Sequence, residues 1–413
     1  MKRMLVVSAS YAPVLNARAF RWTELAGHFA AAGWEFDIVT MLHPGAPARS
    51  EPVKGVRVHR VGFGKVEGVR DRARSGRSGS FVSGVARRIW RALYWPDGDC
   101  IWYWPARREA LRLVQSRAPD AIVSVSPTFT AVLAGRSAHL ASPAARWIID
   151  LGDPFSLETD IAPNNRALYA RLNARAERRA FAQAHAVSVT TPQTAKRYAE
   201  AFPEAAYKIH VIPPLLSIPP ADAQPLFAPG EALRLVYVGT LYRRLREPGF
   251  MLQLFEALRG RDRRCELHLF GDVQDFGAEF EGWRSRLQGA LHVHGTVPRE
   301  TVARAVAGAD ILVNIGNTTR DQLPSKVVEY AAAGKPILNL ARHADDSSVT
   351  FLETYPDRLT LFDAGAAPAA SQVDALAAFA ERLPRRLPEG EVDAWLAPYR
   401  LPRIAAQYER LLQ

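Results

Sequence analysis

The sequence predicts an α/β protein of two domains, and three observations support that prediction. The chain has 413 residues, which exceeds one ordinary hydrophobic core at a prior of about 150 residues per domain. Short apolar runs alternate with stretches of helical spacing along both halves of the chain. Between residues 213 and 229 six prolines interrupt any periodic pattern, which is typical of a semi-rigid linker.

The first half begins with the strand–loop–helix–strand order of a parallel α/β sheet. The apolar run at 5–8 is the first predicted strand, and residues 19–32 have helical spacing. Gly33 ends that helix before a strand at 36–40. The alternation then continues with strands at 121–125, 146–150, 186–190 and 209–212, and with helices at 129–140, 166–184 and from 192 onward.

After the linker the same alternation starts again. It gives a helix at 248–258 and strands at 234–238, 266–270, 291–293, 311–314 and 336–340. The last segment, 401–412, has helical spacing and is expected to cross back onto the first domain. We therefore predict two facing Rossmann-like domains with these bounds: 1–214 with the C-terminal helix 398–413, a linker at 215–231, and 232–397.

Composition limits the class of protein. The two cysteines, Cys100 and Cys265, lie far apart in sequence, which excludes a disulfide framework and a cysteine-built zinc site. The apolar run at 5–9 is too short for a signal peptide, so we expect a cytoplasmic protein. The net charge of +11 suits nucleic acid, an anionic membrane face or phosphate-bearing substrates, and charge alone does not choose among them.

The most informative motif is Leu-Pro-Ser-Lys-Val-Val-Glu-Tyr-Ala-Ala-Ala-Gly-Lys-Pro-Ile-Leu at 323–338. Ser325 is a favourable N-cap residue, and Gly334 ends the predicted helix. A helix N-terminus presents unpaired N–H groups to an anion such as a diphosphate. Glu329 lies one turn into the helix, where its carboxylate could accept hydrogen bonds from two adjacent ribose hydroxyls.

This motif resembles the donor-binding helix of GT-B glycosyltransferases, in the large group that contains glycosyltransferase family four. It is most similar to enzymes of bacterial capsule, O-antigen and exopolysaccharide assembly. The resemblance implies that Glu329 binds the ribose and that the backbone at Ser325 and Lys326 binds the diphosphate. Gly239 and Thr240 resemble the family's glycine loop below the donor phosphates.

Further resemblances extend over nearly the whole chain. Arg243 and Arg246 stand where the family places basic residues for the diphosphate, and we favour Arg246. The stretches 267–271 and 293–298 resemble the strand ends that flank the nucleotide base. In the first domain, the loops at 8–13 and 17–22 resemble the acceptor-side loop, which makes Ser10, Arg18 and Arg21 acceptor-side candidates.

The segment 149–155 resembles the group's Asp-x-Arg-Asp-Pro-Trp motif at the carboxyl end of a strand, which borders the cleft in such sheets. Asp153 is the first candidate for an acid/base or acceptor-orienting carboxylate, and Asp150 is the second. Ser126 follows another strand and is expected to line the same cleft.

Two positions depart from the family's pattern. Many members have a glutamate eight residues before the ribose-binding one, and here that position is Asp321. The arginine of the Asp-x-Arg-Asp motif is Gly152.

The resemblance implies an enzyme that moves a sugar from a nucleoside-diphosphate sugar to a glycan or polyprenyl-diphosphate-linked acceptor, with retention at the anomeric carbon. The diphosphate charge would be stabilised by the arginines and the helix terminus, so no metal is required. Two alternatives stay open: a nucleotide-sugar 2-epimerase on the same fold, and a non-catalytic partner subunit that retains the fold.

Two further patterns have competing interpretations. The segment 65–95 mixes basic and aromatic residues, which indicates either a surface loop or peripheral contact with an anionic membrane face. Nucleic acid is disfavoured because no recognised binding motif accompanies the charge. His268, His292 and His294 lie near predicted strands, and a structural role is favoured over a metal site because no carboxylate or cysteine spacing accompanies them.

Overall fold

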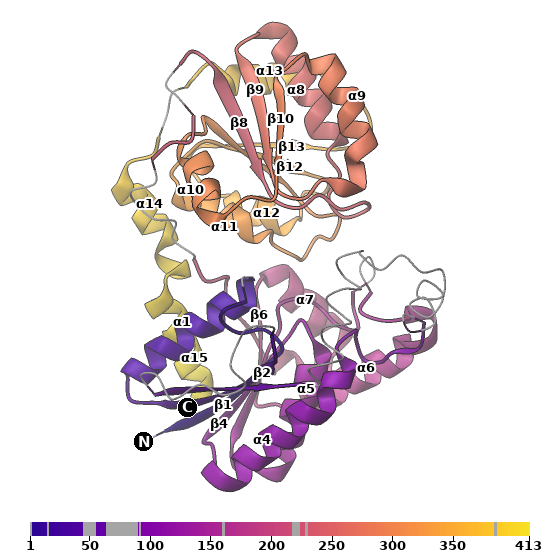
Figure 1. Cartoon of the computed structure of the whole chain (residues 1–413), viewed down its shortest axis with the longest axis vertical. Coiled ribbons are helices and arrows are strands. Elements are labelled where there is room, and N and C mark those ends of the chain that lie inside the picture. The colour runs from indigo at the N-terminus through magenta and orange to yellow at the C-terminus, as the bar shows by residue number, and fades with distance from the viewer. Residues whose placement is uncertain are drawn as a thin grey trace. The chain divides into compact units, whose positions relative to one another are not determined.

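The computed structural model describes residues 2–14, 16–43, 55–62, 90, 92–158, 162–216, 224–227, 230–383 and 386–413, and for Ser325 it describes the backbone alone. The chain forms two compact units (Figure 1). The first comprises Met1–Leu215 and Leu401–Gln413, and the second comprises Leu216–Arg400. Within the described residues, no helix combines the length and the apolar character that a membrane span requires.

The first unit is built on a parallel sheet of seven strands in the order β3-β2-β1-β4-β5-β6-β7. Its strands are β1 (Arg3–Ser8), β2 (Glu35–Met41), β3 (Val56–Val61), β4 (Ala121–Val125), β5 (Arg146–Asp150), β6 (Ala186–Val189) and β7 (Ile209–Val211). The order reverses between β1 and β4. In open parallel sheets, ligands bind beyond the carboxyl ends of the strands at such a reversal.

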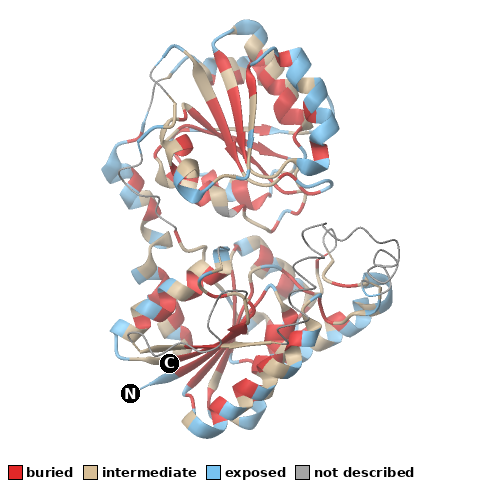
Figure 2. Ribbon diagram, viewed as in Figure 1, coloured by how far each residue is buried: buried red, intermediate tan, exposed pale blue. Residues whose placement is uncertain are grey.

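Helices cover both faces of this sheet, and its inner strands are therefore buried on both faces (Figure 2). Leu5 and Val7 pack on one face with α4 (Tyr103–Arg117) and α5 (Phe129–Ala141). Met4 and Val6 pack on the other face with α1 (Ala17–Ala31) and α15 (Leu401–Leu412). Within the described residues, this unit also contains the helices η1 (Cys100–Trp102), α6 (Arg166–Gln183), α7 (Pro192–Ala201) and η2 (Pro203–Lys208).

The second unit contains a parallel sheet of six strands in the order β10-β9-β8-β11-β12-β13. Its strands are β8 (Leu233–Val238), β9 (Cys265–Phe270), β10 (Leu291–Gly295), β11 (Ile311–Ile315), β12 (Ile337–Ala341) and β13 (Arg358–Phe362). One face packs against α8 (Gly249–Arg261), α9 (Gly277–Leu287) and α13 (Ala370–Ala380). The other packs against α10 (Arg299–Ala307), α11 (Ser325–Ala332), α12 (Ser347–Leu352) and α14 (Glu389–Leu396).

Three details differ from the sequence-based expectation. Leu226 and Phe227 of the predicted linker pack on the second unit, where the Leu226 amide donates to the Arg304 carbonyl of α10, whereas Leu215 packs on the first unit. Residues 397–399 form a short 3-10 helix, so the C-terminal helix begins at Leu401 rather than at 398. The residue that caps α11 is Pro324, and Ser325 is the first helical residue. The pyrrolidine ring holds φ of Pro324 at −59°. Proline also has no amide proton, so no backbone donor is left without a partner at this position.

Candidate active site

Two glycine loops meet at the carboxyl ends of β8 and β9. A Cβ added to Gly271 (φ +138°) would lie 2.2 Å from the carbonyl oxygen of Gly239. A Cβ on Gly239 would lie 2.9 Å from the Tyr237 hydroxyl. Both positions therefore require glycine, and the strand ends carry no side chain there. The predicted glycine loop at Gly239 and Thr240 is thus a place where a ligand can approach the backbone closely.

Arg246 extends over this loop. Its Nη2 donates to the Asn317 side-chain oxygen at 2.7 Å, and its Nη1 lies 3.4 Å from the Thr240 carbonyl. The Nε atom is buried and has no hydrogen-bond partner in the described part of the chain. A buried N–H group without a hydrogen-bond acceptor lowers the stability of the protein unless a ligand supplies that acceptor. This guanidinium is therefore suited to bind an anionic ligand.

Arg243, the second predicted donor-site arginine, has different surroundings. Its guanidinium lies 4.9 Å from the centre of the Phe276 ring, and Nη2 is 3.3 Å from the Glu279 carboxylate. Its side chain is 59% exposed. The structure therefore places Arg246, and not Arg243, with the Gly239 loop.

Helix α11 is fixed to the end of β8 by one hydroxyl. Tyr330 is buried, and its hydroxyl oxygen accepts from the Val238 amide at 2.7 Å and donates to the Val238 carbonyl at 3.3 Å. Burial raises the pKa of Tyr330, Tyr237 and Glu329 add to the rise, and Arg246 opposes it. The Tyr330 hydroxyl thus holds α11 against the end of β8, next to the Gly239 loop.

Lys326 and Glu329 lie one turn apart on α11, as predicted for the donor site. The Lys326 ammonium donates to the Glu329 carboxylate at 2.7 Å, and both side chains are partly exposed. The backbone of Ser325 and Lys326 forms the start of the helix. Asp321, which replaces the family's first glutamate, is buried in the loop before α11.

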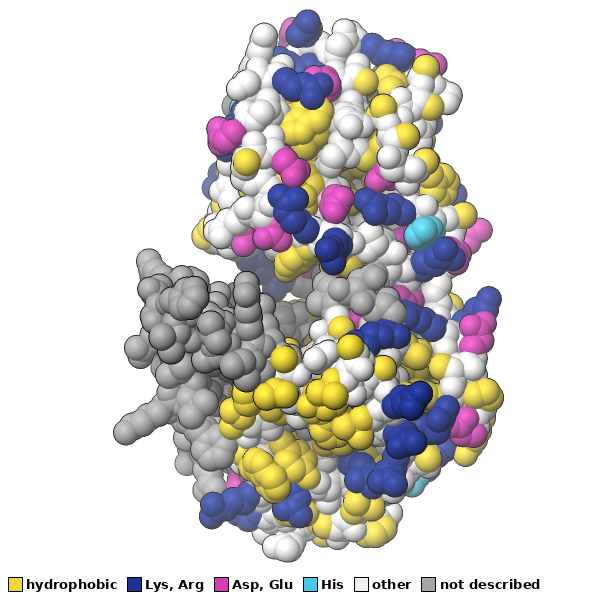
Figure 3. Space-filling view, turned by 90° about the vertical axis from the view of Figure 1, so that its right-hand side faces the viewer, with side chains coloured by type: hydrophobic (Ala, Val, Ile, Leu, Met, Phe, Trp, Pro, Cys, Tyr) yellow, Lys and Arg dark blue, Asp and Glu magenta, His cyan; other side chains and the backbone are white. Residues whose placement is uncertain are grey.

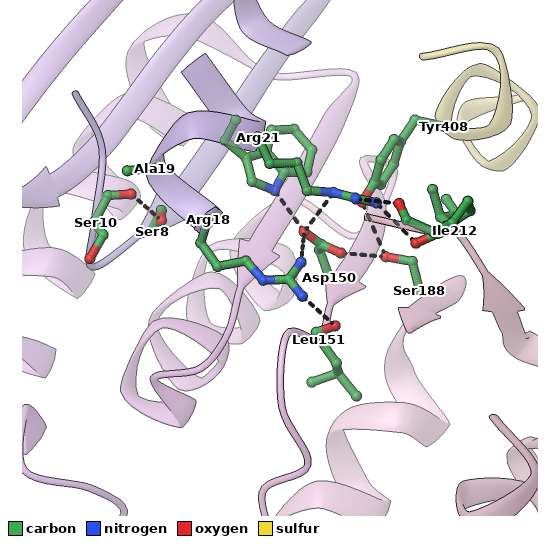
Figure 4. Close-up of polar contacts among 12 residues, drawn as sticks. Ser8, Ser10, Arg18, Ala19, Arg21, Asp150, Leu151, Ser188, Ile212 and Tyr408 are labelled. Carbon is green, nitrogen blue, oxygen red and sulfur yellow. Dashed lines mark hydrogen bonds and ion pairs between the residues drawn. The ribbon is translucent and has the colours of Figure 1, made fainter. Parts of the chain in front are cut away.

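In the first unit, Asp150 ends β5 and lies at the centre of a polar cluster (Figure 4). One carboxylate oxygen accepts from the Trp22 indole at 2.8 Å and from Arg18 at 3.1 Å, and the other accepts from the Ser188 hydroxyl at 2.8 Å. Burial alone would raise the pKa of Asp150, but Arg18, Arg21 and these hydrogen bonds outweigh it and lower the pKa. With both oxygens engaged and 1% exposure, the geometry favours a positioning role over the predicted catalytic one.

Arg21 also differs from its predicted acceptor-side role, because it is buried at 3% exposure. Its guanidinium donates to the Tyr408 hydroxyl of α15 at 2.9 Å and to the carbonyls of Ile212 at 3.3 Å and Pro213 at 2.6 Å (Figure 4). Arg21 therefore joins α1, α15 and the segment after β7, and it stabilises the cluster beneath the surface.

Arg18 occupies the space above Gly152. A Cβ on Gly152 would lie 2.4 Å from Arg18 Nε. The Arg18 guanidinium donates to Asp150 and to the Leu151 carbonyl at 3.2 Å (Figure 4). Where the related motif carries an arginine within the segment, this chain has glycine, and a guanidinium from α1 fills the position. Asp153 follows directly and is exposed.

The two predicted serines make hydrogen bonds through their backbones, and only those of Ser126 reach the Asp150 segment. Ser126 is buried, and its amide donates to the Asp150 carbonyl at 2.9 Å while its carbonyl accepts from the Gly152 amide at 3.2 Å. Ser10 is partly buried, and its carbonyl accepts from the Ser8 hydroxyl at 2.7 Å.

Several residues of the two clusters were not predicted. Trp22 lies in the segment 17–22, which forms the start of α1, and its spacing of four residues from Arg18 could have indicated a shared helix face. No sequence pattern near Ser188, Tyr408 or Asn317 predicts their contacts, because these residues reach the clusters from distant segments of the chain.

One group in the described part of the chain has the spacing of metal ligands. It consists of Glu266, His268 and His292. These residues lie along β9 and β10, whereas the Arg246 loop and α11 lie beyond strand ends.

Comparison with known families and structures identifies the chain. Residues 19–214 match the family described as glycosyl transferase 4-like domain, and residues 232–348 match the family described as glycosyl transferases group 1. No curated protein matches the sequence at a significant level.

Solved glycosyltransferase structures share the fold over the full chain. Sucrose-phosphate synthase from Thermosynechococcus elongatus has 18% identity and a TM-score of 0.68, covering 100% of this chain and 98% of that one. Starch synthase IV of Arabidopsis thaliana, bound to ADP and acarbose, has 12% identity and a TM-score of 0.64, with 100% and 98% covered. HepE of Anabaena, in complex with UDP and glucose, has 13% identity and a TM-score of 0.60, with 100% and 99% covered. The chain is therefore a glycosyltransferase of group 1, in the family-four-like class, with the GT-B fold.

Proposed function

We propose that this enzyme transfers a sugar from a nucleoside-diphosphate sugar to a hydroxyl of a glycan or lipid-linked acceptor. The observation that carries the donor assignment is the convergence of three features in the second unit. These are the start of α11, the Arg246 guanidinium with its unpartnered Nε, and the Glu329 carboxylate one turn into the helix. The nucleoside diphosphates in the HepE and starch synthase IV structures support this class of donor.

Each donor-site group has a role in this proposal. Arg246 and the amides of Ser325 and Lys326 bind the diphosphate, where the helix terminus favours negative charge. Glu329 accepts hydrogen bonds from the ribose hydroxyls, and Lys326 moves from Glu329 toward the phosphates. As the bond between the anomeric carbon and the diphosphate oxygen breaks, these positive groups stabilise the leaving nucleoside diphosphate. The proposal therefore requires no metal for transfer.

The acceptor side is proposed for the first unit. The acceptor hydroxyl oxygen forms the new bond to the anomeric carbon, and its proton passes to a base. Asp153 is the proposed base or orienting carboxylate, because it is exposed beside a segment that Arg18 and Asp150 hold rigid. We further propose retention at the anomeric carbon, as the family resemblance implies.

A lipid-linked acceptor is supported by an apolar and basic surface on the first unit. Figure 3 shows hydrophobic side chains gathered on this unit, with Lys and Arg side chains beside them. Helix α6 exposes arginines, and its one acidic residue, Glu177, is buried. Large apolar side chains are exposed on this helix (Leu168 and Leu172), in the segment before α4 (Trp90, Leu93 and Ile101) and at the start of α4 (Trp104).

Such a surface suits the headgroup region of an anionic membrane. For the segment 65–95 the sequence left a surface loop and membrane contact both open, and most of this segment lies outside the described residues. We propose a role in bacterial surface-polysaccharide assembly at the cytoplasmic face of the membrane.

The first test is thermal stability against a panel of nucleoside diphosphates and their sugars, with and without a divalent cation. A ligand that binds only the folded state raises the melting temperature. We expect one nucleoside diphosphate to raise it independently of the cation, and donor turnover to follow when the correct acceptor is present. If no ligand in the panel shifts the melting temperature, the donor-site assignment is wrong. A shift without turnover on any acceptor would instead favour a non-catalytic partner.

A further inference from the structure

Three histidines and a glutamate lie on one face of the edge of the second sheet. Glu266 and His268 are alternate residues of β9, and His292 and His294 are alternate residues of β10, the edge strand. The two strands are parallel, and His268 is in register with His292. Because alternate residues of a strand point to the same face, the four side chains project together from two paired strands.

The separations in this group are those of metal ligands. The Glu266 carboxylate oxygen is 3.3 Å from His268 Nε2, and the ligating atoms of Glu266, His268 and His292 all lie within 4.8 Å of one another. Two ligands of a tetrahedral zinc ion, each bound at about 2.0–2.1 Å, are about 3.3 Å apart. The Glu266–His268 pair already has this spacing.

His292 needs only a side-chain rotation to complete the set. Its ring is stacked on that of His268, with ring centroids 4.4 Å apart. In this orientation its nitrogen does not point to the same position as the Glu266 carboxylate oxygen and His268 Nε2. His292 is partly exposed, which leaves its ring room to turn. The strand backbones, which fix the Cα positions, do not have to move.

The surroundings of His268 are those of an oriented metal ligand. Its Nδ1 lies 3.1 Å from His294 Nε2, and this hydrogen bond leaves Nε2 to face Glu266. The His268 side chain is buried. Phe227 covers it at a centroid distance of 4.4 Å.

We propose that Glu266, His268 and His292 bind one divalent transition-metal ion, with water as the fourth ligand and His294 orienting His268. Two imidazoles and one carboxylate favour Zn²⁺ over Mg²⁺ or Ca²⁺, which prefer oxygen ligands. Arg234, whose Nε is 3.9 Å from Glu266, would turn away from the carboxylate on binding. The ion would fasten the edge strand β10 to β9. This structural role is independent of the proposed transfer reaction and of the donor assignment.

The test uses tag-free full-length protein that has been stripped of metal with a chelator and dialysed. Co²⁺ is titrated by visible absorption, and Zn²⁺ is titrated against a chromophoric chelator. We expect one equivalent to bind, with the intense visible bands of four-coordinate cobalt, and Zn²⁺ to raise the melting temperature. His292→Ala and Glu266→Gln should each weaken binding by about 100-fold or more. His294→Ala should weaken it by about 10–100-fold, as loss of an orienting partner does.

The matched control is His210→Ala, which removes an exposed histidine from β7 of the first unit. This variant should bind the ion as tightly as the wild type. Because His292 is partly exposed, His292→Ala should fold, and its circular dichroism spectrum checks this. Either of two results would overturn the proposal: wild-type protein that binds no stoichiometric Co²⁺ or Zn²⁺, or His292→Ala and Glu266→Gln variants that bind as tightly as the wild type. The group would then be a hydrogen-bonded histidine chain only.

Discussion

Two arginines three residues apart in one loop have different surroundings, and this difference defines the donor site at the scale of single residues. Arg246 contacts Asn317 and the Thr240 carbonyl beside two glycine loops, whereas Arg243 pairs with Glu279 in solvent. An exposed ion pair contributes little to stability or binding. Charge alone therefore does not select the phosphate-binding residue, and the partners of each guanidinium do.

Arg246→Ala should weaken donor binding by about 10–100-fold, because a charge-assisted contact to phosphate contributes about 1.5–3 kcal/mol. Arg243→Ala is the matched control and should change the Kd by less than about threefold. The measurement is calorimetric titration with the nucleoside diphosphate that the thermal panel identifies. Equal losses in the two variants would contradict the assignment of Arg246.

Glu329→Gln should lower donor affinity by about tenfold or more, because the carboxylate accepts hydrogen bonds from two ribose hydroxyls. A deoxyribose nucleoside diphosphate makes the test specific to the sugar. Wild-type protein should prefer the ribonucleotide, and the variant should lose most of that preference. A preference that persists unchanged in Glu329→Gln would show that another residue recognises the ribose.

At the scale of single elements, β5 and α1 build the acceptor-side cluster together. The end of β5 supplies Asp150, the loop after it supplies Gly152, and α1 supplies Arg18, Arg21 and Trp22. Each buried charge in this cluster has an opposite charge and hydrogen-bond partners, as buried ionic groups require. The cluster holds the start of the Asp153 segment in one conformation.

Gly152→Ala should separate Arg18 from Asp150 without disturbing the backbone. The new Cβ would lie 2.4 Å from Arg18 Nε, so the guanidinium must move. We expect kcat to fall by about tenfold or more while the donor KM stays within about threefold. Gly27→Ala, also a glycine-to-alanine change and one in α1 with no atom within 4 Å of the added Cβ, should leave kcat unchanged. If kcat of Gly152→Ala equals that of the wild type, Arg18 does not position the active segment.

Asp150 gives the first unit a defined response to acid. Its folded-state pKa is lowered, so the ionised carboxylate stabilises the fold above the unfolded pKa of about 3.9. This contribution is lost as pH falls through the lower folded-state pKa. In Asp150→Asn the melting temperature should fall at pH 7, because Arg18 and Arg21 lose their counter-charge. The gap from the wild type should persist down to about pH 4 and narrow below it. A constant gap at every pH would show that Asp150 is not ionised in the folded protein.

At the scale of the whole molecule, each parallel sheet carries one candidate cluster beyond the carboxyl ends of its strands. The donor cluster belongs to the second unit, and the acceptor-side cluster belongs to the first. The exposed apolar and basic surface also belongs to the first unit. Under the proposed function, the unit that binds the acceptor is thus the one that contacts the membrane.

The double variant Leu168→Ser/Leu172→Ser should reduce binding to anionic vesicles by about tenfold or more. Full burial of one leucine side chain in the membrane contributes about 1.5–3 kcal/mol to binding, and the variant loses two such contributions. Vesicle flotation with phosphatidylglycerol-containing membranes measures this. Tyr207→Ser is the control, because Tyr207 is 77% exposed on η2, outside the proposed surface. Equal flotation of the double variant and the wild type would remove the structural support for a lipid-linked acceptor.

The sequence by itself determined the two parallel sheets and the position of α11. Strands at 121–125 and 146–150 coincide with β4 and β5, because strands buried on both faces are continuous apolar runs bounded by turn residues. The strand β3, the helix α4 and the edge strand β13 were not predicted, since their burial patterns are mixed. The spacing of apolar residues does not predict helices and strands whose faces are only partly buried.

Only the tertiary structure decided what the charged residues do. Arg21 meets Tyr408 across 387 residues of chain, Arg246 meets Asn317 across 71, and Glu266 joins histidines from a neighbouring strand. These contacts determine which groups are buried, which are paired and which have a shifted pKa. The sequence motifs bring candidate residues to the correct ends of the strands. Their accessibility and ionisation depend on partners from distant segments, and no local pattern encodes those partners.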